Sequence, residues 1–210
     1  MGTPDTNRLE NLRSKFLQMT SPQEFGQERK ENVTIISRNV PPMLARADAA
    51  FIVLTDALRN ASPDQPEINY KLLSEIAADA REQAQNADRL TRADSIRADF
   101  TDLIESLDLL CRHLSVLKVI SEAELNACKR AESICFHNAQ NSEIIFQKIK
   151  RDLLIDLQNI LADLCPAFLE KRQIFLESFT KADMDRFTHA HGTFTAFSKN
   201  RIYGPGHEKN

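Results

Sequence analysis

The strongest constraint in this sequence is the distribution of its helix-breaking residues. Glycine is absent from Gln27 through His191, and neither proline nor glycine occurs between Pro66 and Pro166. Each of these residue types costs about 1 to 3 kcal/mol inside a helix, and tight turns favour both. A stretch of this length without them holds few tight turns. The chain is therefore expected to form a small number of very long helices.

The composition favours the same fold class and excludes several functions. Hydrophobic residues make up 42% of the 210 residues, enough for a sizeable core, while aromatic residues reach only 7%. The net charge of −3 argues against nucleic-acid binding, which needs an excess of Lys and Arg. No secretory signal and no apolar run of about 18 to 20 residues is apparent. The sequence predicts an all-α cytoplasmic protein.

Apolar residues spaced by three and four predict three helices. The first spans about residues 22–60, where Pro41 and Pro42 predict a kink, with a full break as the alternative. Turn residues and two prolines at 60–66 follow it. The second helix spans about residues 67–137, which at 1.5 Å per residue corresponds to roughly 105 Å. A turn at 137–142 would lead into the third.

The second predicted helix carries a regular apolar seam. Its members alternate by four and three, the 3.5-residue period of contacts between long helices. The seam consists of Phe100, Leu103, Leu107, Leu110, Leu114 and Leu117. Breaks near Thr91 or at the capping-box pattern of Ser121 are the alternative, and they would give four or five shorter helices in a compact monomer.

Three parts of the chain remain: the third helix, the C-terminal tail and the N-terminal segment. The third helix spans residues 142–190 and bends at Pro166, and a flexible tail is expected at 191–210. Residues 1–21 predict an amphipathic helix that lies in a lipid interface; a short helix packed on the body or on a partner is the alternative. This segment contains Leu9, Leu12, Arg13, Lys15, Phe16 and Met19.

Residues that could support catalysis or bind a metal are scarce in this pattern. Cys128 and Cys135 stand about 10 Å apart along a helix, too far to share one zinc ion, and His137 lies off their face. His189 and His191 fit adventitious metal binding at most. Without a nucleotide-binding glycine loop, the chain is expected to be no enzyme and to need no cofactor or metal. Buried thiols of a reducing compartment are expected at Cys111, Cys128, Cys135 and Cys165.

Three helices of such unequal length cannot close a compact bundle alone. Dimerisation solves this, giving an elongated antiparallel six-helix coiled-coil that the proline kinks curve into an arc. With the stretches 100–110 (FTDLIESLDLL) and 146–154 (FQKIKRDLL), this architecture resembles the BAR domain, most closely that of the sorting nexins. The resemblance covers about residues 23–187 of a domain placed at 22–190. The first twenty residues of the chain contain no phosphoinositide-binding PX domain, which sorting nexins carry ahead of the BAR domain. A fragment or a stand-alone BAR protein is therefore expected.

The resemblance implies a curvature-sensing or membrane-shaping dimer on endosomal or other intracellular membranes. Its partners would be an identical or related BAR chain and an anionic, phosphoinositide-containing bilayer. The basic residues expected to meet the lipid are Lys129, Arg130, Lys148, Lys150 and Arg151.

Two alternatives remain open. The first is that the basic residues form only a solvated face, because Glu124, Glu132 and Glu143 lie among them. The whole chain also fits a vinculin-like or spectrin-like helical scaffold that binds proteins and no lipid.

Overall fold

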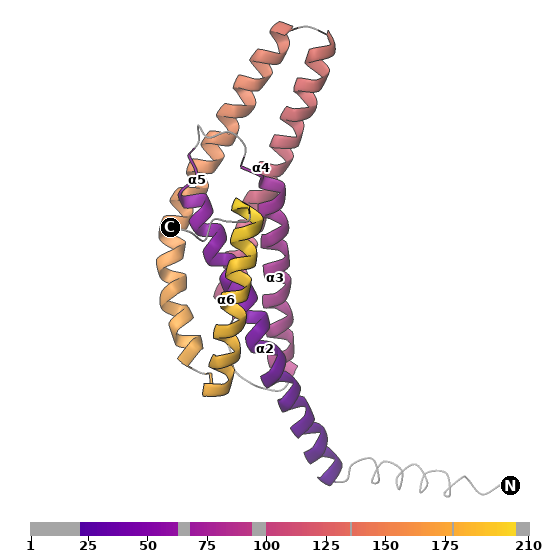
Figure 1. Ribbon diagram of the computed structural model, residues 1–210, viewed down its shortest axis with the longest axis vertical. Coiled ribbons are helices and arrows are strands. Elements are labelled where there is room, and N and C mark those ends of the chain that lie inside the picture. The colour runs from indigo at the N-terminus through magenta and orange to yellow at the C-terminus, as the bar shows by residue number, and fades with distance from the viewer. Residues whose placement is uncertain (1–21, 63–67, 94–99, 135, 178, 205–210) are drawn as a thin grey trace, which may run out of the picture.

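The computed structural model describes residues 22–62, 68–93, 100–134, 136–177 and 179–204. Every regular element in these ranges is an α-helix, and neighbouring helices pack antiparallel (Figure 1). The all-α prediction is therefore confirmed. The helices are α2 (Pro22–Arg59), α3 (Tyr70–Ala93), α4 (Thr101–Ile134), α5 (Phe136–Glu177) and α6 (Lys181–Tyr203).

Helix α2 confirms the first predicted helix. It continues through Pro41 and Pro42, so the alternative of a full break is wrong. Two prolines remove two backbone donors, but burial of the apolar residues that follow holds the helix together. The helix packs against α3 on one side and α6 on another. Its buried apolar residues include Val40, Leu44, Ala47, Phe51, Leu54 and Leu58.

The prediction of one unbroken second helix is wrong. The chain turns back between α3 and α4, and α4 returns along α3. Near the end of α3, the hydroxyl of Thr91 donates to the carbonyl oxygens of Ala87 at 3.1 Å and Asp88 at 3.0 Å. Such bonds compete with regular helix bonding and bend helices without proline or glycine. The other candidate break, Ser121, lies inside continuous α4.

The fold-back buries the face of α3 that carries small residues against other helices of the same chain. Arg81 Nη1 on α3 lies 3.2 Å from Asp108 Oδ1 on α4. Burial, and then the nearby carboxylate of Glu124, raise the pKa of Tyr70 at the start of α3. Small residues let the helices approach closely. The fully buried ones on α3 are Ala77, Ala80, Ala84 and Ala87.

The third predicted helix is also divided, and both of its ends are corrected. Helix α5 begins at Phe136, so the turn expected at 137–142 is helical. It contains Pro166, as predicted, but ends at Glu177. Thr180 then caps α6, because its hydroxyl oxygen accepts the backbone N–H of Asp183 at 3.2 Å.

The expected flexible tail is wrong for residues 191–203, which form the second half of α6. Gly192 lies inside this helix at an exposed position. Contacts of α6 with α2 offset the roughly 1 kcal/mol that a helical glycine costs. The helix ends at Gly204, whose φ of 85° few other residues adopt and whose N–H donates to Asn200 O at 3.0 Å.

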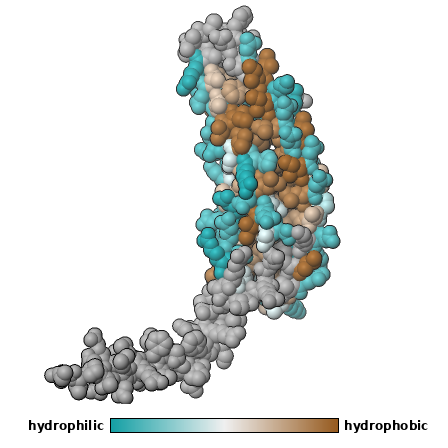
Figure 2. All heavy atoms as spheres, turned by 180° about the vertical axis from the view of Figure 1, so that it is seen from behind, coloured by the Kyte–Doolittle hydropathy of each residue, from teal (hydrophilic) through white to brown (hydrophobic). Residues whose placement is uncertain are grey.

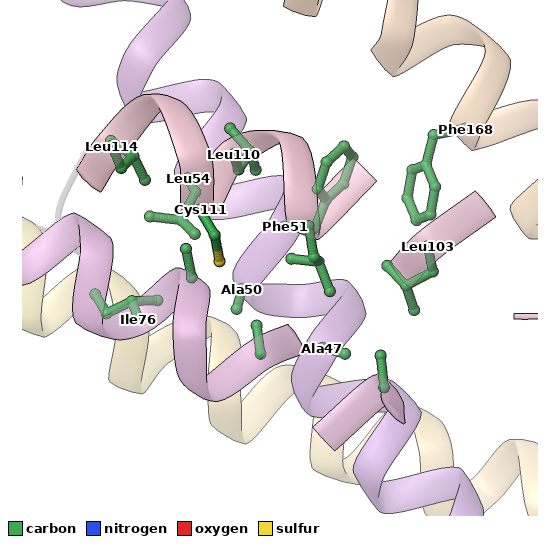
Figure 3. Close-up of a cluster of buried hydrophobic side chains, with 14 of the residues drawn as sticks. Ala47, Ala50, Phe51, Leu54, Ile76, Leu103, Leu110, Cys111, Leu114 and Phe168 are labelled. Atoms are coloured by element: carbon green, nitrogen blue, oxygen red, sulfur yellow. The ribbon is translucent and has the colours of Figure 1, made fainter. Parts of the chain in front are cut away.

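The apolar seam of the predicted second helix forms the core of a single chain. All six of its members, Phe100, Leu103, Leu107, Leu110, Leu114 and Leu117, are buried. Figure 3 shows Leu103, Leu110 and Leu114 turned toward residues of α2 and α3. Across this core the rings of Phe51 and Phe168 lie 4.4 Å apart between centroids. The five described helices therefore cover this seam within one chain, without the second chain that the three-helix prediction required.

Candidate interaction site

Helices α4 and α5 extend beyond the rest of the bundle as a two-helix arm (Figure 1). Among the described side chains, burial on α4 ends at Leu117 and burial on α5 begins at Leu154. We call the part of the hairpin beyond these two residues the arm. Below it, Gln158 Nε2 donates to Leu58 O and Ala61 O at 2.8 Å each, which joins α5 to the end of α2.

Polar contacts between the two helices hold the arm together. Glu124 forms an ion pair with Lys150, and its Oε1 accepts from Gln147 Nε2 at 3.0 Å. Only 12% of the Glu124 side chain and 17% of the Lys150 side chain are exposed. Lys150 is therefore turned inward and paired, which leaves it poorly placed for the membrane contact predicted from the sequence.

The remaining basic residues of the predicted cluster are exposed but do not share one face. A helix turns about 100° per residue, so Lys129 and Arg130 point in different directions. The residues directly after Leu117 and Leu154, and those at repeats of three, four and seven residues farther along the arm, lie on one side of the hairpin. We call this side the basic face. It contains Leu125, Lys129, Ile144, Lys148 and Arg151, all exposed. Ile144, Lys148 and Arg151 also line an open hollow of about 840 Å³, together with the acidic residues Glu143 and Asp152.

The opposite side of the hairpin is apolar. Val116 and Leu153 directly precede the buried residues Leu117 and Leu154. Each therefore points about 100° away from its buried neighbour, in the same rotational sense about its own helix. In an antiparallel pair, equal rotations bring residues to the same side. Repeats of three, four and seven residues extend this apolar face. On α4 it consists of Val116, Ile120, Ala123 and Ala127, and on α5 of Phe146, Ile149, Leu153, Ile160 and Leu164.

This apolar face is open to solvent. Val116 is 48% exposed and Ile149 is 39% exposed, while Ile120, Phe146 and Leu153 are half-buried. Figure 2, which views the molecule from behind, shows a band of apolar residues running along the hairpin below its end. Contiguous apolar surface of this kind is the usual composition of interaction sites, which makes this face the candidate site.

A buried charged cluster joins the helices of the body. The fully buried carboxylate of Asp48 on α2 has its Oδ1 2.6 Å from Arg172 Nε on α5 and its Oδ2 3.0 Å from His191 Nε2 on α6. The ring of Phe187 stacks on His191 with centroids 5.6 Å apart. This cluster was not predicted from the sequence, although Asp48 stands inside the apolar run of α2. It fixes α5 and α6 to α2.

Within the described residues, no group of three or more His, Cys, Asp or Glu side chains could hold a metal ion. None of their helices is long and apolar enough to cross a bilayer. Cys111 and Cys165 are buried free thiols, and burial raises the pKa of Cys111, which keeps its thiol protonated.

The amphipathic segment predicted at residues 1–21 lies outside the described residues, as does Cys135. Comparison with protein-family models, with curated proteins and with solved structures finds no match for this chain.

Proposed function

We propose that this chain is a non-catalytic helical scaffold that binds a partner protein through the apolar face of its α4–α5 hairpin. The observation that carries the proposal is the continuous row of exposed and half-buried apolar side chains along one side of the hairpin. Covering them with a partner removes apolar surface from water, at roughly 25 cal/mol per Å². The centre of a stable protein interface has this composition.

Ion pairs connect the helices of the body from which the hairpin extends. They join α2 with α3 through Arg46 and Asp79 at 2.7 Å, and α5 with α2 through Arg172 and Asp48 at 2.6 Å. The turn between α3 and α4 also removes the unbroken helix on which the BAR resemblance depended. A bundle of shorter helices favours the scaffold over a curved rod.

A photo-crosslinking residue at Ile149 tests this function in cells. We expect discrete crosslinked products from Ile149, because a partner covers its face, and none from Leu169, which is 50% exposed on the body. The products are identified by mass spectrometry. Equal labelling at both positions, or no product from Ile149, would contradict the proposal.

Binding to an anionic membrane is a second candidate, and the basic face of the arm favours it. Lys129, Lys148 and Arg151 lie on the same side of the hairpin as the exposed apolar residues Leu125 and Ile144. A basic side chain close to an anionic leaflet contributes about 1 kcal/mol. An endosomal or other intracellular membrane remains the surface that this candidate proposes.

Replacing Lys148 and Arg151 by Gln tests the second candidate. The double variant is expected to bind vesicles of phosphatidylcholine and phosphatidylserine about 30-fold more weakly in a sedimentation assay, since two charges correspond to about 2 kcal/mol. Arg59→Gln, at an exposed site on the body, is the control. Unchanged sedimentation of the double variant would exclude this face as the lipid-binding surface.

A further inference from the structure

The apolar face of the hairpin has the dimensions of a small dimer interface. On α5 the face extends about 27 Å from Phe146 to Leu164, and on α4 about 16 Å from Val116 to Ala127, with each helix about 10 Å wide. Each copy would thus cover about 430 Å², and a pair about 870 Å², which is the size of a weak, reversible interface. A flat strip two helices wide matches another strip of the same kind.

Side-chain size varies across this face in a complementary way. Helix α4 presents the small residues Ala123 and Ala127, while α5 presents the large residues Phe146 and Ile149. Starting from the paired residues Glu124 and Lys150, Ala127 lies about 4.5 Å and Phe146 about 6 Å toward the end of the arm. Large residues of one copy can therefore fit over small residues of another when α4 lies on α5.

The edges of the face carry opposite charges. The outer edge of α4 carries exposed Arg112 and Arg130, and that of α5 carries exposed Asp156 and Asp163. Measured from the Glu124–Lys150 pair, Arg112 lies about 18 Å and Asp163 about 19.5 Å toward the body, so the two are nearly level. Placing α4 on α4 would bring like charges together.

We propose that the partner of this face is a second copy of the chain, related by a twofold axis along the hairpin. Helix α4 of each copy lies on α5 of the other, with both arms pointing the same way. Arg112 of one copy meets Asp163 of the other twice, once on each edge. This inference rests on the proposed function, because it names the protein that covers the same face.

Sedimentation equilibrium over a range of concentrations tests the dimer. The wild-type chain is expected to show a reversible monomer–dimer equilibrium, and Ile149→Glu to remain monomeric with an unchanged circular dichroism spectrum. Leu169→Glu, an exposed apolar site outside the face, is the matched control and should dimerise normally.

Charge reversal tests the orientation of the two copies. Arg112→Asp and Asp163→Arg should each weaken the dimer roughly tenfold, because each change alters two symmetry-related contacts. The double variant should restore the wild-type equilibrium. Weakening that adds up in the double variant would contradict the α4-on-α5 arrangement.

The outcomes separate this inference from the proposed function. A wild-type chain that is monomeric at all concentrations, or a dimer that Ile149→Glu leaves intact, would overturn the inference. If Ile149 then crosslinks to a different protein in cells, the scaffold function stands with another partner. If it crosslinks to none, the scaffold function fails as well.

Discussion

Replacing Asp48 by Ala is expected to lower the free energy of unfolding by about 3 to 5 kcal/mol, the usual cost of breaking a buried ion pair. The Asp48 side chain has 0% exposure, while those of Arg172 and His191 are only 22% and 24% exposed. Removing the carboxylate leaves the Arg172 guanidinium without its buried ion-pair partner. Urea denaturation followed by circular dichroism measures the change.

Two further variants show whether charge pairing is the cause. Asp48→Asn keeps a hydrogen-bond acceptor for Arg172 and should destabilise less than Asp48→Ala. Replacing Asp48, Arg172 and His191 together by Leu, Met and Leu should recover much of the loss, because apolar groups of similar volume often replace buried charges without cost. A loss below about 1 kcal/mol for Asp48→Ala would show that the cluster does not form.

Leu107→Glu and Leu110→Glu are each expected to unfold the protein. Both side chains have 0% exposure within a single chain. Truncating a buried leucine costs about 2 to 5 kcal/mol, and burying a carboxylate adds to this. The sum reaches the whole stability of many domains, about 5 to 15 kcal/mol. Loss of the helical circular dichroism signal and of cooperative thermal unfolding would report the effect.

The matched comparison is Ile149→Glu, a similar change on the exposed face of the hairpin. It should leave the helical signal and the midpoint of thermal unfolding nearly unchanged. A folded monomer of Leu107→Glu would instead place the leucine seam between two chains, as the three-helix prediction had it.

The sequence predicts what depends on local periodicity. The period of Leu103, Leu107 and Leu110 identified a buried seam, and the turn residues after Asn60 separated the first two helices. Neither pattern says which chain supplies the contacts. The same seam fits an intermolecular or an intramolecular core, and only the path of the chain after α3 decides between them.

Breaks without proline or glycine were harder to predict. Thr180 and Asp183 have the spacing of a helix cap, so the start of α6 was readable from the sequence. Gly192 led to the wrong prediction of a flexible tail, because it lies inside α6. The break after α3 was predicted only as the alternative near Thr91, and contacts of α3 with α2 and α4 make the fold-back favourable.

The candidate site was only partly predictable for the same reason. Lys148, Lys150 and Arg151 are neighbours in sequence, but Lys150 turns toward Glu124 while the other two face solvent. The Asp48 cluster joins residues 124 positions apart, which no local pattern reveals. The apolar hairpin face becomes visible only when α4 and α5 lie side by side.

The most direct test of this account is an amine crosslink between Lys71 on α3 and Lys118 on α4. Lys71 lies ten residues before Arg81, and Lys118 lies ten residues after Asp108. Because Arg81 and Asp108 form an ion pair between antiparallel helices, the two lysines lie at the same level. An unbroken helix would separate them by roughly 70 Å. We expect a short bifunctional reagent to link them within one chain, as a mixture of normal and ¹⁵N-labelled protein can verify. Absence of the link, or a link only between chains, would contradict the fold-back and the projecting hairpin.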